Sequence, residues 1–226
     1  LSYLFARGRC RYCARPFSVR YMLVELFTGL ACVGAWLVFV ELQLGVAWPG
    51  RWLLVGPVLQ ALLVFVATCA LVVVFLVDLD HLIIPDGAVG VVAVAGLLLD
   101  GLRMLATGVR EMVVFSEPVW FSEHYQVLLP KSLVGMAMGA GALLLIAVVA
   151  DRLFGKPSMG GGDIKLAGAM GAVLGPGYSF FVFFLLAVFA GAAIGLVCLA
   201  LRRKRRRDYL PFGPMLAAAA VAMLYG

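Results

Sequence analysis

The stretch of residues 53–77 contains no charged side chain. A helix needs about 20 mostly apolar residues to cross the hydrocarbon core of a bilayer, so this stretch predicts a membrane span. Hydrophobic residues make up 64% of the chain and charged residues 13%, whereas soluble domains have about 45–50% and about 25%. The composition therefore excludes a soluble enzyme, a disordered tail and a secreted disulfide scaffold.

Further apolar stretches predict an all-α, polytopic membrane protein with about seven spans. The stretch 164–175 is short, and we expect a tilted or locally thinned crossing there. The chain begins with an arginine-rich segment without a signal-peptide pattern, and we expect that its N-terminus is missing. The predicted spans are residues 21–44, 53–77, 87–107, 131–152, 164–175, 178–201 and 210–226.

Eleven of the 18 basic residues lie in two clusters, five in residues 1–20 and six in residues 202–207. Beside apolar spans, such clusters favour the cytoplasmic side and contact with anionic membrane lipids over nucleic acid. We therefore expect residues 1–20 to form a cytoplasmic loop and residues 21–226 a membrane-embedded domain. Seven crossings then place 14 basic residues on the cytoplasmic side and four outside, where we expect loop 108–130 to be an interfacial segment.

Acidic residues lie at the boundary of the second predicted span. Asp78 follows the apolar stretch directly, and Asp80, His81 and Asp86 come shortly after it. Ionisable residues at membrane depth are costly, which makes them candidates for function. We expect Asp80 and His81 to lie in a solvated loop, and Asp86 to be the N-cap of the following helix.

A second acidic position lies at the same predicted depth. Asp163 follows three glycines, which let another chain come close, and it begins the apolar helix predicted over 164–175. Asp163 could be a helix N-cap or a functional carboxyl group. Together with Asp78 it suits aspartic protease chemistry, because two carboxyl groups at close range share one proton. The helix dipole favours Asp163 as the ionised base, which leaves Asp78 as the acid.

These motifs resemble those of a known family. The segment Gly160-Gly-Gly162-Asp163 with Lys165 resembles the G-x-G-D motif of membrane aspartic proteases. Asp78-Leu-Asp80-His81 followed by Ile84-Pro85-Asp86 is similar to the type IV prepilin peptidases within that group. Other segments that match the family are Leu1–Leu4, Arg7–Cys13, Ser18–Glu25 and Pro211–Pro214.

The resemblance implies a membrane aspartic endopeptidase of the bacterial cytoplasmic (inner) membrane. Asp78 and Asp163 would be catalytic, and Gly160 and Gly162 would shape the site. The implied substrates are type IV prepilins or type II secretion pseudopilins, whose basic leader is removed at the cytoplasmic face. Bifunctional members also N-methylate the new terminus with S-adenosylmethionine. No glycine-rich nucleotide-binding turn supports methylation here, so that expectation comes from the resemblance alone.

Cys10 and Cys13 resemble the second half of a four-cysteine zinc site in bifunctional members. A structural zinc site needs four ligands and this pair supplies two, and the family pattern places the other pair and a first span before Leu1. The alternative is a reduced, solvent-facing thiol pair. Glu25 is expected either to contact the methyl-transfer site or substrate amine, or to pair with Arg20 at the membrane interface.

Two other classes of protein remain open on the sequence. A transporter could use Asp78 and Asp163 as ion or proton ligands, but its site should lie near the midplane, and no two halves of the chain look alike. A non-catalytic scaffold of a secretion complex would leave the coincidence of the two aspartates unexplained. The expected partners are the substrates and membrane lipids, without nucleic acid, and the sequence leaves the oligomeric state open.

Overall fold

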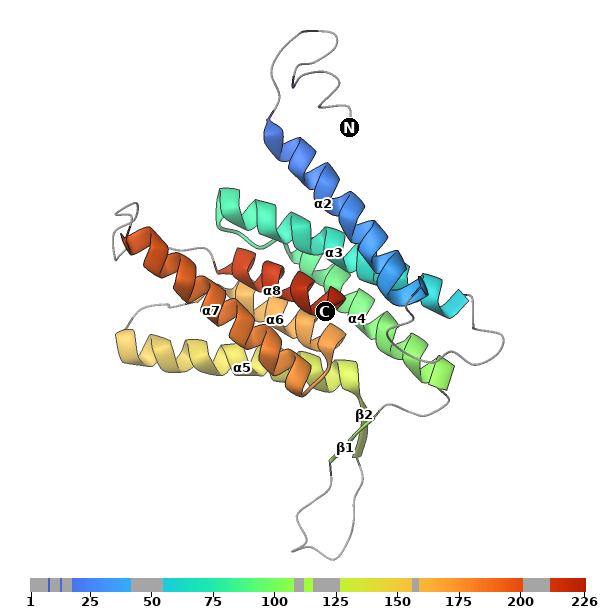
Figure 1. Cartoon of the computed structure of the whole chain (residues 1–226). Helices are drawn as coiled ribbons and strands as arrows, with labels where there is room; N and C mark the ends of the chain where they lie inside the picture. Colours follow the sequence, from blue (N-terminus) through green and yellow to red (C-terminus); the bar gives the residue numbers. More distant parts are fainter. Residues whose placement is uncertain are drawn as a thin grey trace, which may run out of the picture.

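The structure is a computed structural model, and it describes Gly8, Cys13 and residues 18–41, 55–107, 112–115, 127–155, 159–200 and 212–226. Within these ranges seven α-helices alternate in direction along the chain (Figure 1). They are α2 (Val19–Trp36, continued by the π-helix η1, Leu37–Glu41), α3 (Val55–His81), α4 (Asp86–Thr107), α5 (Lys131–Phe154), α6 (Gly161–Leu174), α7 (Tyr178–Ala200) and α8 (Gly213–Tyr225).

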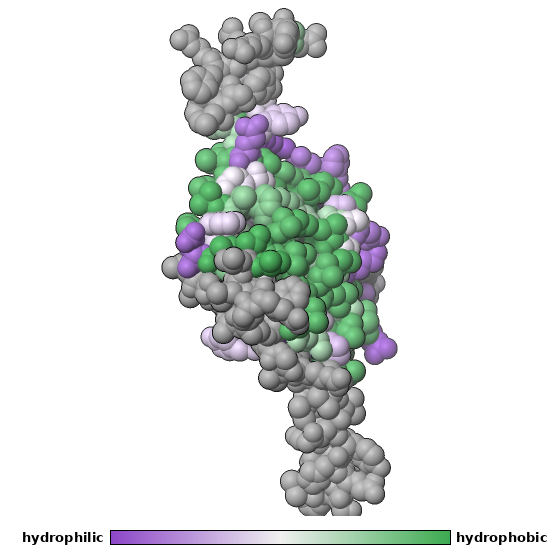
Figure 2. Space-filling view, turned by 90° about the vertical axis from the view of Figure 1, so that its right-hand side faces the viewer, coloured by the Kyte–Doolittle hydropathy of each residue, from purple (hydrophilic) through white to green (hydrophobic). Residues whose placement is uncertain are grey.

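Five of these helices are long and apolar enough to cross a membrane: α2 with η1, α3, α4, α5 and α7. Apolar side chains cover most of the coloured part of the face in Figure 2, which suits contact with lipid rather than water. The prediction of a polytopic helical membrane protein is confirmed, and a helix lies within each of the seven predicted stretches over the residues that the structure describes. α6 and α8 have 14 and 13 residues, or about 20 Å each against a hydrocarbon core of about 30 Å.

Helix α6 lies at the centre of the bundle, and every residue of 166–173 is buried. Glycines let its neighbours approach backbone to backbone. A Cβ on Gly135 of α5 would overlap the backbone of Gly171, and one on Gly96 of α4 would lie 2.8 Å from the backbone of Ala172. These contacts fix α6, and with it the position of its first turn.

The end of α3 differs from the sequence prediction. Asp80 and His81 lie in the last helical turn and not in a loop. The helix continues because the amide of Leu82 still donates to the carbonyl of Asp78, at 3.0 Å. Leu82 then adopts a left-handed conformation, with φ of 55°, which ends the helix and turns the chain toward α4.

The start of α4 also differs from the prediction of an Asp86 N-cap. The carbonyl of Pro85 accepts the amides of Ala88 and Val89, at 3.1 and 3.2 Å, so Pro85 holds the cap position and Asp86 lies in the first turn. The side chain of Asp86 instead bonds to another helix, as described below.

The opposite end of the bundle carries a short hairpin where an interfacial segment was expected. Strand β1 (Met112–Phe115) pairs antiparallel with β2 (Val127–Pro130). Nearby, the buried Asp100 of α4 accepts the amide and the hydroxyl of Ser132, at 2.9 and 2.7 Å. Asp100 therefore caps the start of α5, which gives this buried acid a structural role.

Candidate active site

Both predicted aspartates lie at one end of the bundle, called here the aspartate end. Asp78 is in the last turn of α3, and Asp163 is in the first turn of α6. The first residue of α8, Gly213, lies at the same end, as does the α3–α4 turn that contains Ile84. The alternating direction of the helices explains this meeting, because α3 finishes at the end where α6 and α8 begin (Figure 1).

Asp78 is buried, with 5% of its surface exposed. Its carboxyl group lies against the backbone of Gly213, where an added Cβ would come 2.6 Å from Oδ2 and 3.0 Å from Cγ. Only a glycine allows α8 to begin this close to the carboxyl group. The backbone of Gly213 is a hydrogen-bond donor close to the Asp78 carboxyl group, while Oδ2 makes no hydrogen bond of ordinary geometry with the described residues. A buried acceptor without a partner requires an explanation, and a reactive carboxyl group provides one.

Asp163 is the third residue of α6. One of the two sequence interpretations had made it the N-cap of this helix, and the structure does not place it there. The N-cap is Gly160, whose carbonyl accepts the amide of Asp163 at 3.2 Å. The Asp163 carboxyl group in turn accepts a hydrogen bond from the backbone of Gly160. This is the acidic half of a capping box, in which a side chain at the third position bonds back to the cap amide.

The two carboxyl groups are close enough to interact electrostatically. Asp163 precedes the apolar stretch 164–175, and burial raises the pKa of its carboxyl group to about 6. The negative charge of Asp78 adds to this rise in pKa, while the hydrogen bond from Gly160 opposes it. The structure therefore brings the two predicted aspartates together, as the shared depth of Asp78 and Asp163 in the sequence led us to expect.

Ile84 packs between two glycines of the site. An added Cβ on Gly162 would lie 2.8 Å from the Ile84 Cβ, and one on Gly213 would lie 3.0 Å from its Cδ1. The predicted site-shaping role of Gly162 thus has a geometric basis in this contact. At Gly160 an added Cβ would lie 3.5 Å from Asp163 Oδ2, which is ordinary contact. Sequence reasoning missed Gly213, although its neighbourhood in Pro211–Pro214 had been noted.

Two other carboxylates of this end form exposed ion pairs. Asp86 Oδ1 lies 2.8 Å from Nζ of Lys165. Asp80 accepts both of its hydrogen bonds from one nitrogen of Arg20, at 2.8 and 2.9 Å. Glu25, which had been expected either to pair with Arg20 or to serve methyl transfer, is exposed on α2. The role of Glu25 stays a prediction.

The predicted zinc ligands are only partly described. Cys13 is exposed in a turn, whereas Cys10 lies outside the described residues, as does the basic cluster 202–207. Within the described parts of the chain, no group of three or more His, Cys, Asp or Glu side chains could hold a metal ion. The two cysteines supply half of the four ligands that structural zinc requires. Zinc binding therefore stays a prediction.

The fold and the site together define a class of protein: a polytopic helical membrane protein in which two aspartates at helix ends lie close enough to interact electrostatically. The model of the bacterial peptidase A24 N-terminal domain matches residues 1–39, and the model of the type IV leader peptidase family matches residues 64–196. The second match covers more than half of the chain. The chain belongs to the type IV leader peptidase family.

Curated relatives carry the name prepilin leader peptidase/N-methyltransferase. Those from Aeromonas hydrophila and Burkholderia pseudomallei are 34% and 32% identical over 100% of this chain, and the one from Xanthomonas campestris pv. campestris is 30% identical over 99%. The alignments cover 65%, 60% and 65% of these relatives, so the chain spans somewhat less than two thirds of their length. No solved structure matches the chain.

Proposed function

We propose that this protein is a membrane aspartic endopeptidase that removes the basic leader of type IV prepilins or type II secretion pseudopilins. The observation that carries the proposal is the electrostatic interaction between Asp78 and Asp163 at one end of the bundle, with the backbone of Gly213 against the Asp78 carboxyl group. Two such carboxyl groups share one proton. The ionised carboxylate takes a proton from the attacking water, and the protonated one donates to the scissile carbonyl oxygen.

The proposed assignment makes Asp163 the base and Asp78 the acid. Asp163 lies in the first turn of α6, where the helix dipole stabilises a negative charge. Burial and the negative charge of Asp78 raise the pKa of Asp163 to about 6, so the two carboxyl groups do not ionise independently. Because the two groups interact, the proton belongs to the pair, and the pH dependence of cleavage reports the pair as a whole.

The position of the site supports a substrate that is partly in the membrane. Both aspartates lie at the ends of helices, so a bond cleaved there would sit where the bilayer meets water. The positive-inside rule predicts that residues 1–20 lie on the cytoplasmic side of the membrane. These residues precede α2 at the aspartate end, so the aspartate end is predicted to face the cytoplasm. The proposed location is the cytoplasmic (inner) membrane of a bacterium. The position at the helix ends also speaks against the transporter alternative, whose site should lie near the midplane.

We further propose N-methylation of the new terminus with S-adenosylmethionine. Its support is the double name of the relatives and the match of the N-terminal domain model to residues 1–39. Cys10 and Cys13 would hold a structural zinc ion together with two further ligands. Mass spectrometry of the cleaved product tests this activity, because methylation requires S-adenosylmethionine and adds mass to the new N-terminus only.

The experiment for the peptidase uses the full-length protein in lipid and a substrate with a basic leader and an apolar segment. Wild type is compared with Asp78→Asn, Asp163→Asn and the control Asp86→Asn, which changes an exposed, ion-paired carboxylate. We expect product from wild type and the control only. Cleavage by either variant of the aspartate pair would contradict the mechanism. Absence of cleavage by wild type would refute the peptidase and favour the transporter.

A further inference from the structure

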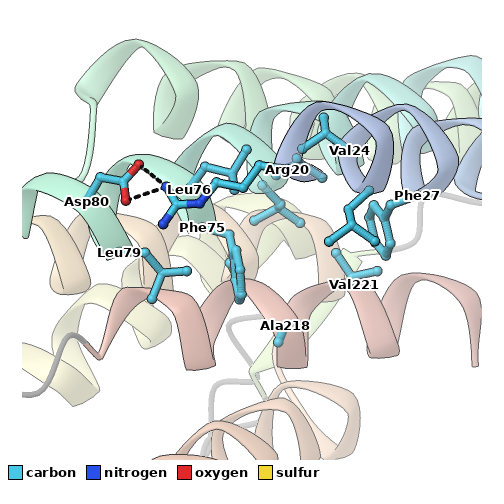
Figure 3. A pocket seen from close by; sticks show the side chains of 13 residues that line it. Arg20, Val24, Phe27, Phe75, Leu76, Leu79, Asp80, Ala218 and Val221 are labelled. Carbon is cyan, nitrogen blue, oxygen red and sulfur yellow. Dashed lines mark hydrogen bonds and ion pairs between the residues drawn. The ribbon is translucent and has the colours of Figure 1, made fainter. Parts of the chain in front are cut away.

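An apolar groove of about 470 Å³ lies between α2, α3 and α8 (Figure 3). Its walls are apolar along their length, and the ion pair between Arg20 and Asp80 lies at one end. The side chains that represent the three walls are Val24 and Phe27 of α2, Phe75 and Leu76 of α3, and Ala218 and Val221 of α8.

The groove begins beside the candidate active site. Its α3 wall ends at Asp80, two residues after Asp78. Its α8 wall starts at Ala217, one helical turn after Gly213, which touches the Asp78 carboxyl group. One turn rises about 5.4 Å, so along α3 and α8 the groove begins within about one turn of Asp78 and Gly213.

Helix α2 is attached to the bundle on either side of the groove. Only 6% of the apolar, membrane-spanning stretch of α2 is buried within the bundle. Beyond the groove, Tyr225 of α8 donates to the carbonyl of Ala31 at 3.1 Å and also bonds to Thr68 of α3 at 3.0 Å. At the aspartate end, Arg20 holds Asp80. The hollow between these two attachments is therefore bounded on three sides by helices.

We propose that this groove binds the apolar helix of the substrate, with the end nearest the scissile bond toward Arg20 and Asp80. The inference rests on the proposed peptidase function. Along α3 the groove runs from Leu71 to Asp80, about 13 Å, which matches two to three turns of a helix. An apolar helix laid in a groove presents side chains at i, i+3, i+4 and i+7, and these would fill the hollow.

The polarity of the groove matches such a substrate and its orientation. The apolar walls suit the membrane segment, and the charged pair suits the point where that segment gives way to a polar leader. Asp80 and Arg20 are both part-exposed, at 44% and 67% of their side chains, so either can exchange its partner for a charge of the leader. A few extended residues beyond the helix end, at about 3.3 Å each, then reach the carboxyl group of Asp78 on the adjacent face of α3.

Site-specific photocrosslinking tests this proposal. Benzoylphenylalanine replaces Phe27, which lines the groove, or Leu26, which is exposed on α2 but does not line it. The two neighbours share the same depth and differ by about 100° around the helix. Both are made in the full-length Asp163→Asn protein, which is expected to hold the substrate uncleaved. We expect an adduct with the apolar segment of the substrate from position 27 and none above background from position 26.

A second measurement fills the groove. Ala218→Phe should slow cleavage of the membrane substrate about 10-fold or more, because it occupies the space of an apolar side chain. Ala222→Phe places the same ring at an exposed position of α8 that does not line the groove and should cleave at the wild-type rate. The proposal would be overturned by equal adducts from positions 26 and 27, or by adducts to lipid or to a second copy only. It would also be overturned if Ala218→Phe cleaved at an unchanged rate. If position 27 forms the adduct but the wild-type protein does not cleave the substrate, the result would support binding in the groove and refute the peptidase activity.

Discussion

Gly213 offers a sharp test of the packing of α8 against Asp78, because replacing it with alanine adds a single methyl group. That methyl would lie 2.6 Å from Oδ2 of Asp78 and 3.0 Å from the Ile84 Cδ1. To restore even a 3.0 Å contact, the Asp78 carboxyl group must move by at least 0.4 Å (3.0 minus 2.6). A misplacement of about 1 Å can cost about 100-fold in rate, so we expect cleavage to slow about 10- to 100-fold, or about 1.4 to 2.7 kcal/mol.

The fold should tolerate this change. Gly213 is the first residue of α8, and its φ is not positive, so alanine fits the backbone and is the better helix former. The assay compares kcat/KM for a leader-bearing substrate, together with the melting temperature in detergent. Gly87→Ala is the matched control, because Gly87 lies at the same end of the bundle with no atom within 4 Å of an added Cβ. Wild-type cleavage by Gly213→Ala would refute the contact between α8 and a catalytic carboxyl group.

Three further predictions follow from the same geometry. Between pH 5 and 7, kcat/KM should fall as the pH rises through about 6, because the negative charge of Asp78 contributes to the Asp163 pKa of about 6, so above that pH the pair has lost the proton that it must donate; a flat pH–rate profile would contradict the shared proton. Gly162→Ala should lose more activity than Gly161→Ala. An added Cβ at position 162 would lie 2.8 Å from Ile84, whereas one at position 161 would have no atom within 4 Å. Equal losses of cleavage in the peptide assay would argue against this packing. Asp100→Ala should lower the free energy of unfolding by about 2 kcal/mol, because Ser132 loses both of its bonds in a buried position; unchanged thermal unfolding in detergent would contradict the cap.

The helices could be predicted because they depend on apolar stretches, which are visible along the chain. Each of the seven stretches contains a helix in its described part, and the positions of Asp78 and Asp163 at opposite termini of their helices follow from where those stretches stop and start. The exact ends were harder to predict. Asp80 lies in a helix because the amide of Leu82 makes one more helical hydrogen bond before the chain turns at Leu82. No residue type at these positions indicates where the helix ends.

The partners of the polar side chains could not be predicted, because they depend on how helices far apart in sequence pack. Arg20 bonds to Asp80, 60 residues on, a contact that the sequence does not indicate. Asp100 drew no attention in the sequence, and its bonds to Ser132 appear only when α4 and α5 lie side by side. The approach of Gly213 to Asp78 likewise depends on the packing of α8 against α3 and α6.

The central claim is that Asp78 and Asp163 act as one unit on one bond. The most direct measurement is a double-mutant cycle on cleavage of a leader-bearing substrate, with Asp78→Asn, Asp163→Asn and the combined variant in the full-length protein. Groups that act as a unit are strongly non-additive. The account predicts that each single variant is as inactive as the double variant, while Asp86→Asn retains cleavage. Losses that simply add, or substantial cleavage by either single variant, would contradict it.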